Sequence, residues 1–181
     1  MNRTKLQVIF DAEKIAARNR ELAQEIKAAN PDRLLVVAVL KGSFVFAADL
    51  IRALHEVGLA PEVEFISLSS YRAGKVSSGT VTVLRDVESD VRGRDVLLVD
   101  DILESGRTLA YAKDLLAARG ASRVLVCVLL EKPAKRAVSL HADFVGFVCP
   151  DVFVVGYGMD VGHAFRQLPF IGVVQTEEAA S

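Results

Sequence analysis

The sequence has few of the features that mark secreted, zinc-binding or membrane proteins. Only two cysteines occur among 181 residues, Cys127 and Cys149, neither of them in a CxxC pair, and the three histidines are scattered. This argues against a disulfide framework and against a zinc site. No apolar run approaches the roughly 18 residues that a membrane span needs, and the N-terminus lacks the apolar segment of a secretion signal. We therefore expect a cytoplasmic protein with no membrane partner.

Net charge is almost absent too. The chain has 22 Lys and Arg against 23 Asp and Glu, which leaves a formal net charge of −1. A protein that binds nucleic acid through its overall field would be strongly basic, so we expect no nucleic-acid partner. Hydrophobic residues make up 51% of the chain, and this length suits one domain with one sizeable core. We expect a single domain over residues 1–181, with a frayed tail at 176–181.

Apolar segments of strand length alternate with amphipathic segments of helix length. Strands are expected at 33–40, 62–70, 80–86, 94–100, 122–131 and 170–174, shorter strands or loops at 143–150 and 153–159, a polar loop at 71–79, and helices at 12–30, 43–58 and 106–120. This alternation predicts an α/β fold with a mainly parallel sheet flanked by helices. Ligands of such sheets bind beyond the carboxyl ends of the strands. The stretches "LKGS", "DDILESGRT" and "EKPAKR" fall at such ends.

The stretch "VLLVDDILESGRTL" carries the most chemistry. Ser105, Gly106 and Thr108 lie at a strand-to-helix turn, where free backbone N–H groups and the helix dipole favour an anion such as a monophosphate. Neither the GxxxxGK[ST] loop nor the GxGxxG fingerprint is present. The preceding carboxylates of Asp100 and Asp101 suit sugar hydroxyls or Mg²⁺. The alternative is an ordinary capped helix preceded by solvated acids.

This stretch resembles the motif with which type I phosphoribosyltransferases bind phosphoribosyl diphosphate (PRPP). Five further segments extend the resemblance to the hypoxanthine-guanine phosphoribosyltransferases: "VVAVLKGSFVFAADLIR", "ISLSSYRAG", "LLEKPAKR", "DFVGFVCPDVFVVGYGMD" and "FRQLPFIGVV". Together they cover about residues 5 to 175 in order. The resemblance implies the type I phosphoribosyltransferase fold, with a small hood and a mobile active-site loop. It also implies purine salvage, in which PRPP and hypoxanthine or guanine give IMP or GMP and pyrophosphate.

The resemblance assigns the residues of the central stretch to PRPP. It implies that the 5′-phosphate is bound by Ser105, Gly106, Arg107 and Thr108. It implies that Asp100 and Asp101 bind the ribose hydroxyls and Mg²⁺, and that Asp160 is a further Mg²⁺ ligand. Glu104 lies where the family usually has an aspartate, the proposed base at purine N7. Glutamate keeps the carboxylate and adds a methylene, which changes its reach. The alternative is that Glu104 only orders the loop.

The remaining roles implied by the resemblance concern pyrophosphate and the purine. Lys41 and Gly42, after a cis Leu40–Lys41 peptide, and Arg166 match pyrophosphate contacts. The purine side is matched by Lys132 at the exocyclic O6, by Phe153 stacking on the ring, by the backbone of Val154 and by the neighbouring Asp160. An ammonium at O6 favours a 6-oxopurine over adenine, which has no acceptor there.

Ser70 and Tyr71 match the recurrent pair of the mobile loop, which would close over the site and exclude water. The resemblance also suggests a homodimer or homotetramer. It assigns no role to His163.

Two other protein classes share part of this pattern. Pyrimidine-operon attenuation regulators, which bind RNA and have uracil phosphoribosyltransferase activity, share the fold and a similar acid-rich stretch that includes Arg107. The segments "EKPAKR" and "FVVGYGMD" fit the purine enzymes better. A phosphoacceptor receiver domain also pairs acids, but its pair follows the first strand. Within the purine enzymes, the choice among hypoxanthine, guanine and xanthine stays open.

Overall fold

Two β-sheets and three α-helices make up the fold, seen in a computed structural model that describes residues 5–70 and 81–175. In chain order the elements are β1 (Lys5–Phe10), α1 (Ala12–Ala28), β2 (Leu35–Leu40), α2 (Phe44–Glu56), β3 (Glu62–Ser70), β4 (Val81–Arg85), β5 (Asp95–Leu103), α3 (Arg107–Ala118), β6 (Arg123–Glu131), the 3₁₀ helix η1 (Pro133–Lys135), β7 (Phe144–Val148), β8 (Val154–Val155) and β9 (Ile171–Gln175).

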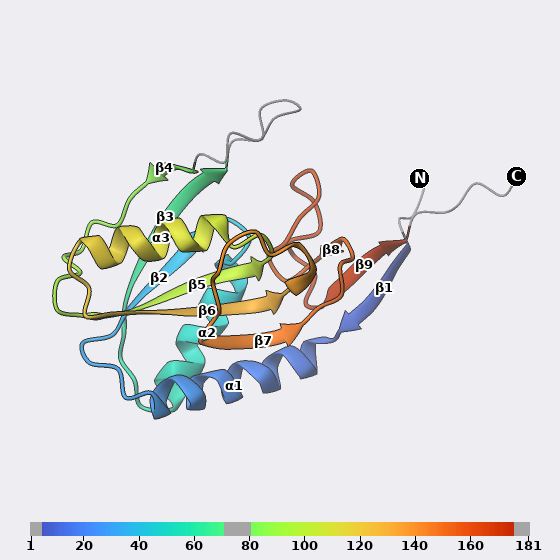
Figure 1. The fold of residues 1–181 in the computed structure, drawn as a ribbon. Coiled ribbons are helices and arrows are strands. Elements are labelled where there is room, and N and C mark those ends of the chain that lie inside the picture. The colour runs from blue at the N-terminus through green and yellow to red at the C-terminus, as the bar shows by residue number, and fades with distance from the viewer. Residues whose placement is uncertain (1–4, 71–80, 176–181) are drawn as a thin grey trace, which may run out of the picture.

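The larger sheet has six strands in the order β4-β3-β2-β5-β6-β7. Its neighbours run parallel except β4, which pairs antiparallel with β3 at the edge. Helices α1 and α2 cover one face of this sheet and α3 covers the other (Figure 1). The predicted α/β class with a mainly parallel, helix-flanked sheet is confirmed.

Strand β2 shows why the apolar runs of the sequence are continuous rather than alternating. Every residue from Leu35 to Val39 is buried. Because successive side chains point to opposite faces, Val36 and Ala38 pack in the core beneath α1 and α2, whereas Leu35, Val37 and Val39 pack in the core beneath α3. A strand covered on both faces needs apolar residues at every position.

The smaller sheet forms a hood at the carboxyl ends of the parallel strands. Its order is β1-β9-β8, with antiparallel pairing throughout, and it lies beyond the arrowheads of β5, β6 and β7 (Figure 1). The sequence prediction missed β1, none of whose residues is buried. This strand is defined by pairing with β9 at the other end of the chain, for example Leu6 with Val174, and not by a local pattern.

Strand β5 runs three residues beyond its predicted end at position 100. Its pairing with β6 continues through Ile102, which lies opposite Leu130, and Leu103, which lies opposite Glu131. Asp100 and Asp101 therefore lie within the strand, and their side chains start toward opposite faces. The helices begin and end close to the predicted points, with the Asp11 carboxylate accepting a hydrogen bond from the Lys14 N–H at 2.8 Å.

Candidate functional site

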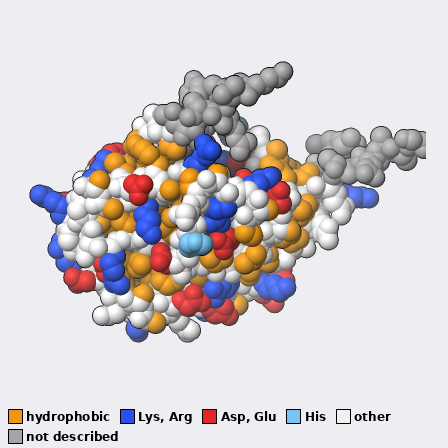
Figure 2. All heavy atoms as spheres, in the orientation of Figure 1, with side chains coloured by type: hydrophobic (Ala, Val, Ile, Leu, Met, Phe, Trp, Pro, Cys, Tyr) orange, Lys and Arg blue, Asp and Glu red, His pale blue; other side chains and the backbone are white. Residues whose placement is uncertain are grey.

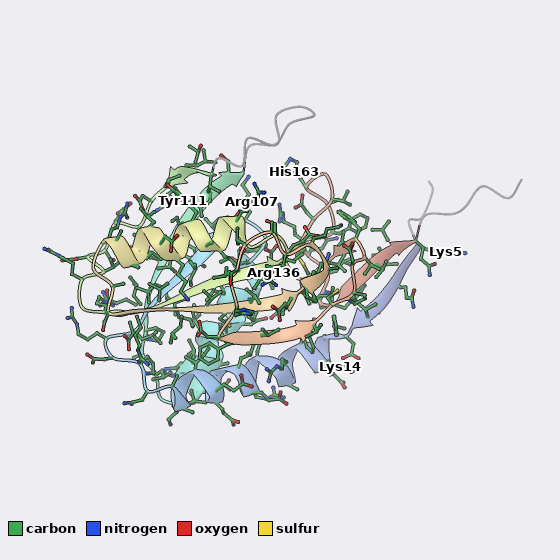
Figure 3. The ribbon with its side chains drawn as sticks, in the orientation of Figure 1. Lys5, Lys14, Arg107, Tyr111, Arg136 and His163 are labelled. Atoms are coloured by element: carbon green, nitrogen blue, oxygen red, sulfur yellow. The ribbon has the colours of Figure 1, made fainter. Side chains whose placement is uncertain are left out.

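The turn after β5 builds a small polar pocket at the N-terminus of α3. The pocket measures about 180 Å³ and is lined by Asp100, Ile102, Leu103, Glu104, Ser105, Gly106, Thr108 and Leu109. Gly106 has a φ of 80°, which a glycine adopts without strain, and a Cβ there would approach Val138 to 3.0 Å. The Arg107 side chain is exposed at the start of α3 (Figure 3) and is not among the lining residues. Backbone N–H groups at this turn suit a phosphate.

Asp100 and Asp101 form an unequal pair. The Asp100 side chain is buried, and its carboxylate accepts a hydrogen bond from the Asp101 N–H at 2.9 Å. Burial, and then the neighbouring charge of Asp101, raise the pKa of Asp100 well above its ordinary value. Asp101 instead turns toward the loop after β2, where an added Cβ on Gly42 would meet its Oδ2 at 1.8 Å.

Replacing Asp100 by asparagine is expected to stabilise the ligand-free protein by about 1–2 kcal/mol at pH 7.5, since asparagine carries no charge to bury. The folded-state pKa lies above the unfolded value, so this penalty appears as pH rises above the unfolded value of about 3.9. Calorimetric melting at pH 4 and pH 7.5 checks this, with exposed Asp114→Asn as the control. An Asp100→Asn gain that does not grow with pH would contradict the assignment.

The loop after β2 lies directly against Asp101. The Leu40–Lys41 peptide is cis, as the resemblance implied. The Ser43 hydroxyl donates to the Val39 carbonyl at 2.5 Å, and a Cβ on Gly158 in the hood would lie 2.4 Å from the Gly42 carbonyl oxygen. Gly42 is thus enclosed between a carboxylate and the hood, while the Lys41 side chain is exposed.

A second pocket of about 330 Å³ lies between the strand ends and the hood. It is lined by Asp101, Ile102, Glu104, Lys132, Lys135, Phe153, Val154, Met159 and Asp160. Lys132 is buried, and its ammonium donates to the Val152 carbonyl at 2.7 Å. Phe153 is 58% exposed, so its ring is available to a ligand. Glu104 and Ile102 line both pockets, so these two residues lie between them.

The segment after β8 brings Asp160 and Arg166 together. Arg166 forms an ion pair with Asp160 at 2.7 Å and donates to the Gly158 carbonyl at 2.6 Å. The His163 N–H donates to the other Asp160 oxygen at 2.8 Å, and the His163 side chain is exposed on the hood loop (Figure 3). Arg166 is therefore held by Gly158 and Asp160, and it lines neither of the two pockets at the strand ends.

The carboxylates fit a hard divalent cation such as Mg²⁺, which prefers oxygen ligands. Within residues 5–70 and 81–175, however, no three His, Cys, Asp or Glu side chains come together in a group that could hold a metal ion. Mg²⁺ is commonly bound by one or two carboxylates together with substrate phosphates and water. Asp100, Asp101 and Asp160 thus suit an ion that a phosphorylated ligand helps to bind, and the predicted Mg²⁺ stays a prediction.

Two predicted residues cannot be placed at the site. Ser70 ends β3, and the structure does not describe its side chain; Tyr71 and the loop 71–79 lie outside the described residues, as does the tail 176–181. Their predicted roles stay predictions.

The structure also brings in residues to which the sequence analysis gave no role. Lys135 lines the second pocket and pairs with Asp151 at 2.8 Å. Arg136, beyond the end of β6 (Figure 3), donates to the Glu104 carbonyl at 3.0 Å, to the Leu140 carbonyl, and to the Glu131 carboxylate at 3.0 Å. The sequence feature that could have indicated Lys135 and Arg136 is the basic stretch "EKPAKR" at a strand end. A run of charges alone does not distinguish a solvated lysine from a lysine of a binding site.

A larger hollow of about 740 Å³ lies elsewhere, between α1, α2 and the segment 166–169. It is lined by three arginines, among them the predicted site residue Arg166, and by two acids of α2, Asp49 and Glu56. The two smaller pockets are the better candidates because they lie at the carboxyl ends of parallel strands, where ligands of such sheets bind.

Comparison with known proteins identifies what the chain is similar to. The family model of the phosphoribosyl transferase domain matches residues 6–161. The bifunctional protein TilS/HprT of Listeria innocua is 47% identical over 165 residues; these cover 91% of this chain but 24% of that relative, so the chain spans about a quarter of its length. The hypoxanthine phosphoribosyltransferase of Escherichia coli K12 is 42% identical over 89% of this chain and 88% of that relative.

A solved structure is similar to nearly the whole chain. The crystal structure of a hypoxanthine phosphoribosyltransferase from Staphylococcus aureus matches with a TM-score of 0.89 and 35% identity, covering 99% of this chain and 96% of that one.

None of the helices in the described part of the chain is both long and apolar enough to cross a membrane.

Proposed function

Because this chain belongs to the phosphoribosyltransferase family, we propose that it is a hypoxanthine or hypoxanthine-guanine phosphoribosyltransferase of purine salvage, a pentosyltransferase. The observation that carries the proposal is the position of Glu104. It lies between a polar pocket at a helix N-terminus and a second pocket containing a buried lysine and an exposed aromatic ring. A phosphate fits the first pocket and a 6-oxopurine fits the second, so the bond between ribose and base would form beside Glu104.

The phosphoribosyl group is held by the first pocket and the acid pair. The backbone and hydroxyls at Ser105, Gly106 and Thr108 bind the 5′-phosphate, with Arg107 adding positive charge at the rim. Asp100 and Asp101 accept hydrogen bonds from the ribose hydroxyls. These contacts fix the C1′ carbon relative to Glu104, which removes much of the entropic cost of bringing the reactants together.

The purine is held by the second pocket. The Lys132 ammonium has three hydrogens and uses one on the Val152 carbonyl, so it can still donate to the purine O6. Phe153 stacks on the ring, and the Val154 backbone contacts its edge. A 6-amino group offers Lys132 no acceptor, which disfavours adenine.

The bond changes then follow. Purine N9 forms the bond to C1′, the electron pair of the C1′–O bond leaves with pyrophosphate, and the Glu104 carboxylate accepts the N7 proton. Lys41, the Gly42 N–H and Arg166 bind the departing pyrophosphate, whose charge grows in the transition state. Asp100, Asp101 or Asp160 would hold Mg²⁺, which would supply further positive charge to stabilise the leaving group.

A panel of bases with PRPP and Mg²⁺ tests this function. Pyrophosphate release is expected with hypoxanthine or guanine, and adenine is expected to react at least about 100-fold more slowly, because the buried Lys132 would face a group that accepts no hydrogen bond. Xanthine is included because the pocket does not rank it. Reaction with uracil alone, or with no base, would overturn the proposal.

The RNA-binding alternative is not favoured. Basic and acidic side chains are interspersed on the face shown in Figure 2, whereas RNA binding calls for a clustered basic surface. The homodimer or homotetramer remains a prediction, to be tested by the molecular mass in solution.

A further inference from the structure

Lys135 places a positive charge between two carboxylates at the mouth of the second pocket. It is the last residue of η1, three residues after Lys132. Its Nζ lies 2.8 Å from Asp151 Oδ1 and 3.8 Å from Glu104 Oε1. The first distance is that of a hydrogen-bonded ion pair. The second is too long for a hydrogen bond and within the range of an ion pair.

The main chain of Glu104 is fixed by the same segment. The Lys132 N–H donates to the Leu103 carbonyl at 2.9 Å, Arg136 donates to the Glu104 carbonyl at 3.0 Å, and the Ala137 N–H donates to the Ser105 carbonyl at 2.9 Å. The backbone on both sides of Glu104 is therefore held in place. The side chain adds three rotatable bonds, so orienting the carboxylate requires an interaction of its own.

We propose that Lys135 is a positioning residue that orients the Glu104 carboxylate toward the purine. This inference rests on the proposed function, in which Glu104 accepts the N7 proton. Asp151 anchors the ammonium by the shorter contact, which keeps it from closing onto Glu104. At 3.8 Å the ammonium attracts the carboxylate without occupying the oxygen that must receive the proton. The other charged groups facing this pocket are Asp101, Lys132 and Asp160.

Because Lys135 is partly exposed, it can be replaced without loss of the fold, and the proposal can therefore be tested by substitution. Its side chain is 59% exposed and that of Glu104 is 35% exposed, so the pair contributes modestly to stability. Lys135→Met removes the charge and keeps most of the stem. Lys135→Arg keeps the charge. Lys14→Met, on α1 away from Arg136 (Figure 3), is the matched control.

Steady-state kinetics with hypoxanthine give the first result. Lys135→Met is expected to lower kcat roughly three- to fivefold, the effect of a partly exposed ion pair, with the KM for PRPP unchanged. Lys135→Arg is expected to restore kcat to within about twofold, and Lys14→Met to match the unaltered protein. A purely structural role would instead shift the KM for PRPP or the melting temperature along with kcat.

A double-mutant cycle with Glu104→Gln decides whether Lys135 acts through Glu104. In the Glu104→Gln background, Lys135→Met is expected to change the single-turnover rate by less than about 1.5-fold. Equal losses in both backgrounds, or no loss in either, would overturn the inference while leaving the proposed function intact. If the unaltered protein and Lys14→Met are inactive with every base, the proposed function fails, and the inference fails with it.

Discussion

Replacing Glu104 by glutamine is expected to lower kcat about 100- to 10,000-fold, the range lost when a general base is removed. Glutamine has nearly the same shape but cannot accept the N7 proton. The KM for PRPP should change little, because the phosphate-binding groups at the start of α3 are untouched. Pyrophosphate release at saturating PRPP and hypoxanthine measures the effect. An unchanged kcat would show that Glu104 only orders the loop.

Two control variants distinguish the effect of the Glu104 charge from the effect of the length of its side chain. Glu104→Asp keeps the carboxylate and removes one methylene, so we expect kcat to stay within about tenfold of the unaltered protein. Glu13→Gln removes a carboxylate in the first turn of α1 that lines neither pocket, and should leave kcat unchanged. A Glu104→Asp variant as slow as Glu104→Gln would show that the position of the carboxylate matters as much as its charge.

Replacing Gly42 by alanine is expected to lower kcat/KM for PRPP about 100-fold or more, because displacements near 1 Å in a positioned site carry costs of that size. The added Cβ would lie 1.8 Å from Asp101 Oδ2 and 2.7 Å from its Cγ. The loop cannot retreat easily, since the Gly42 carbonyl already packs against Gly158. Either Asp101 or the loop that contains Gly42 must move. Kinetics at varied PRPP concentration measure the loss.

Gly58→Ala is the matched control for this substitution. Gly58 has a φ of 86° and nothing within 4 Å of an added Cβ. Alanine there should lower stability by about 1 kcal/mol and leave kcat/KM unchanged. If Gly42→Ala had the same kcat/KM for PRPP as the unaltered protein, the close approach of Asp101 to this loop would not be needed for activity.

Local pattern was sufficient to predict most of the larger sheet. Strand β3 has its predicted bounds, and β2, β5 and β6 begin within two residues of theirs. For β2, β5 and β6 the signal was an unbroken apolar run, which buried parallel strands need. Strand β1 was missed because none of its residues is buried and its partner β9 lies at the far end of the chain. The segment of β9 was predicted as a strand, but local sequence does not reveal that the two segments pair.

The same limit applies to the candidate site. Asp100, Asp101 and the turn at Ser105 are adjacent in sequence, so one stretch was enough to bring them together as a candidate. The approach of Gly42 to Asp101 and of Lys135 to Glu104 joins separate strand ends. These contacts depend on the order of β2, β5 and β6 in the sheet, which residue spacing does not encode.

The pairing of β9 with both β1 and β8 has a consequence for the order in which the protein matures on the ribosome. All six strands of the larger sheet end by Val148, whereas β9 begins at Ile171. A nascent chain can therefore assemble the pocket at the start of α3 before β9 has been synthesised, when β1 and β8 still lack their common partner. The second pocket, which Val154 of β8 lines, is therefore expected to be completed last.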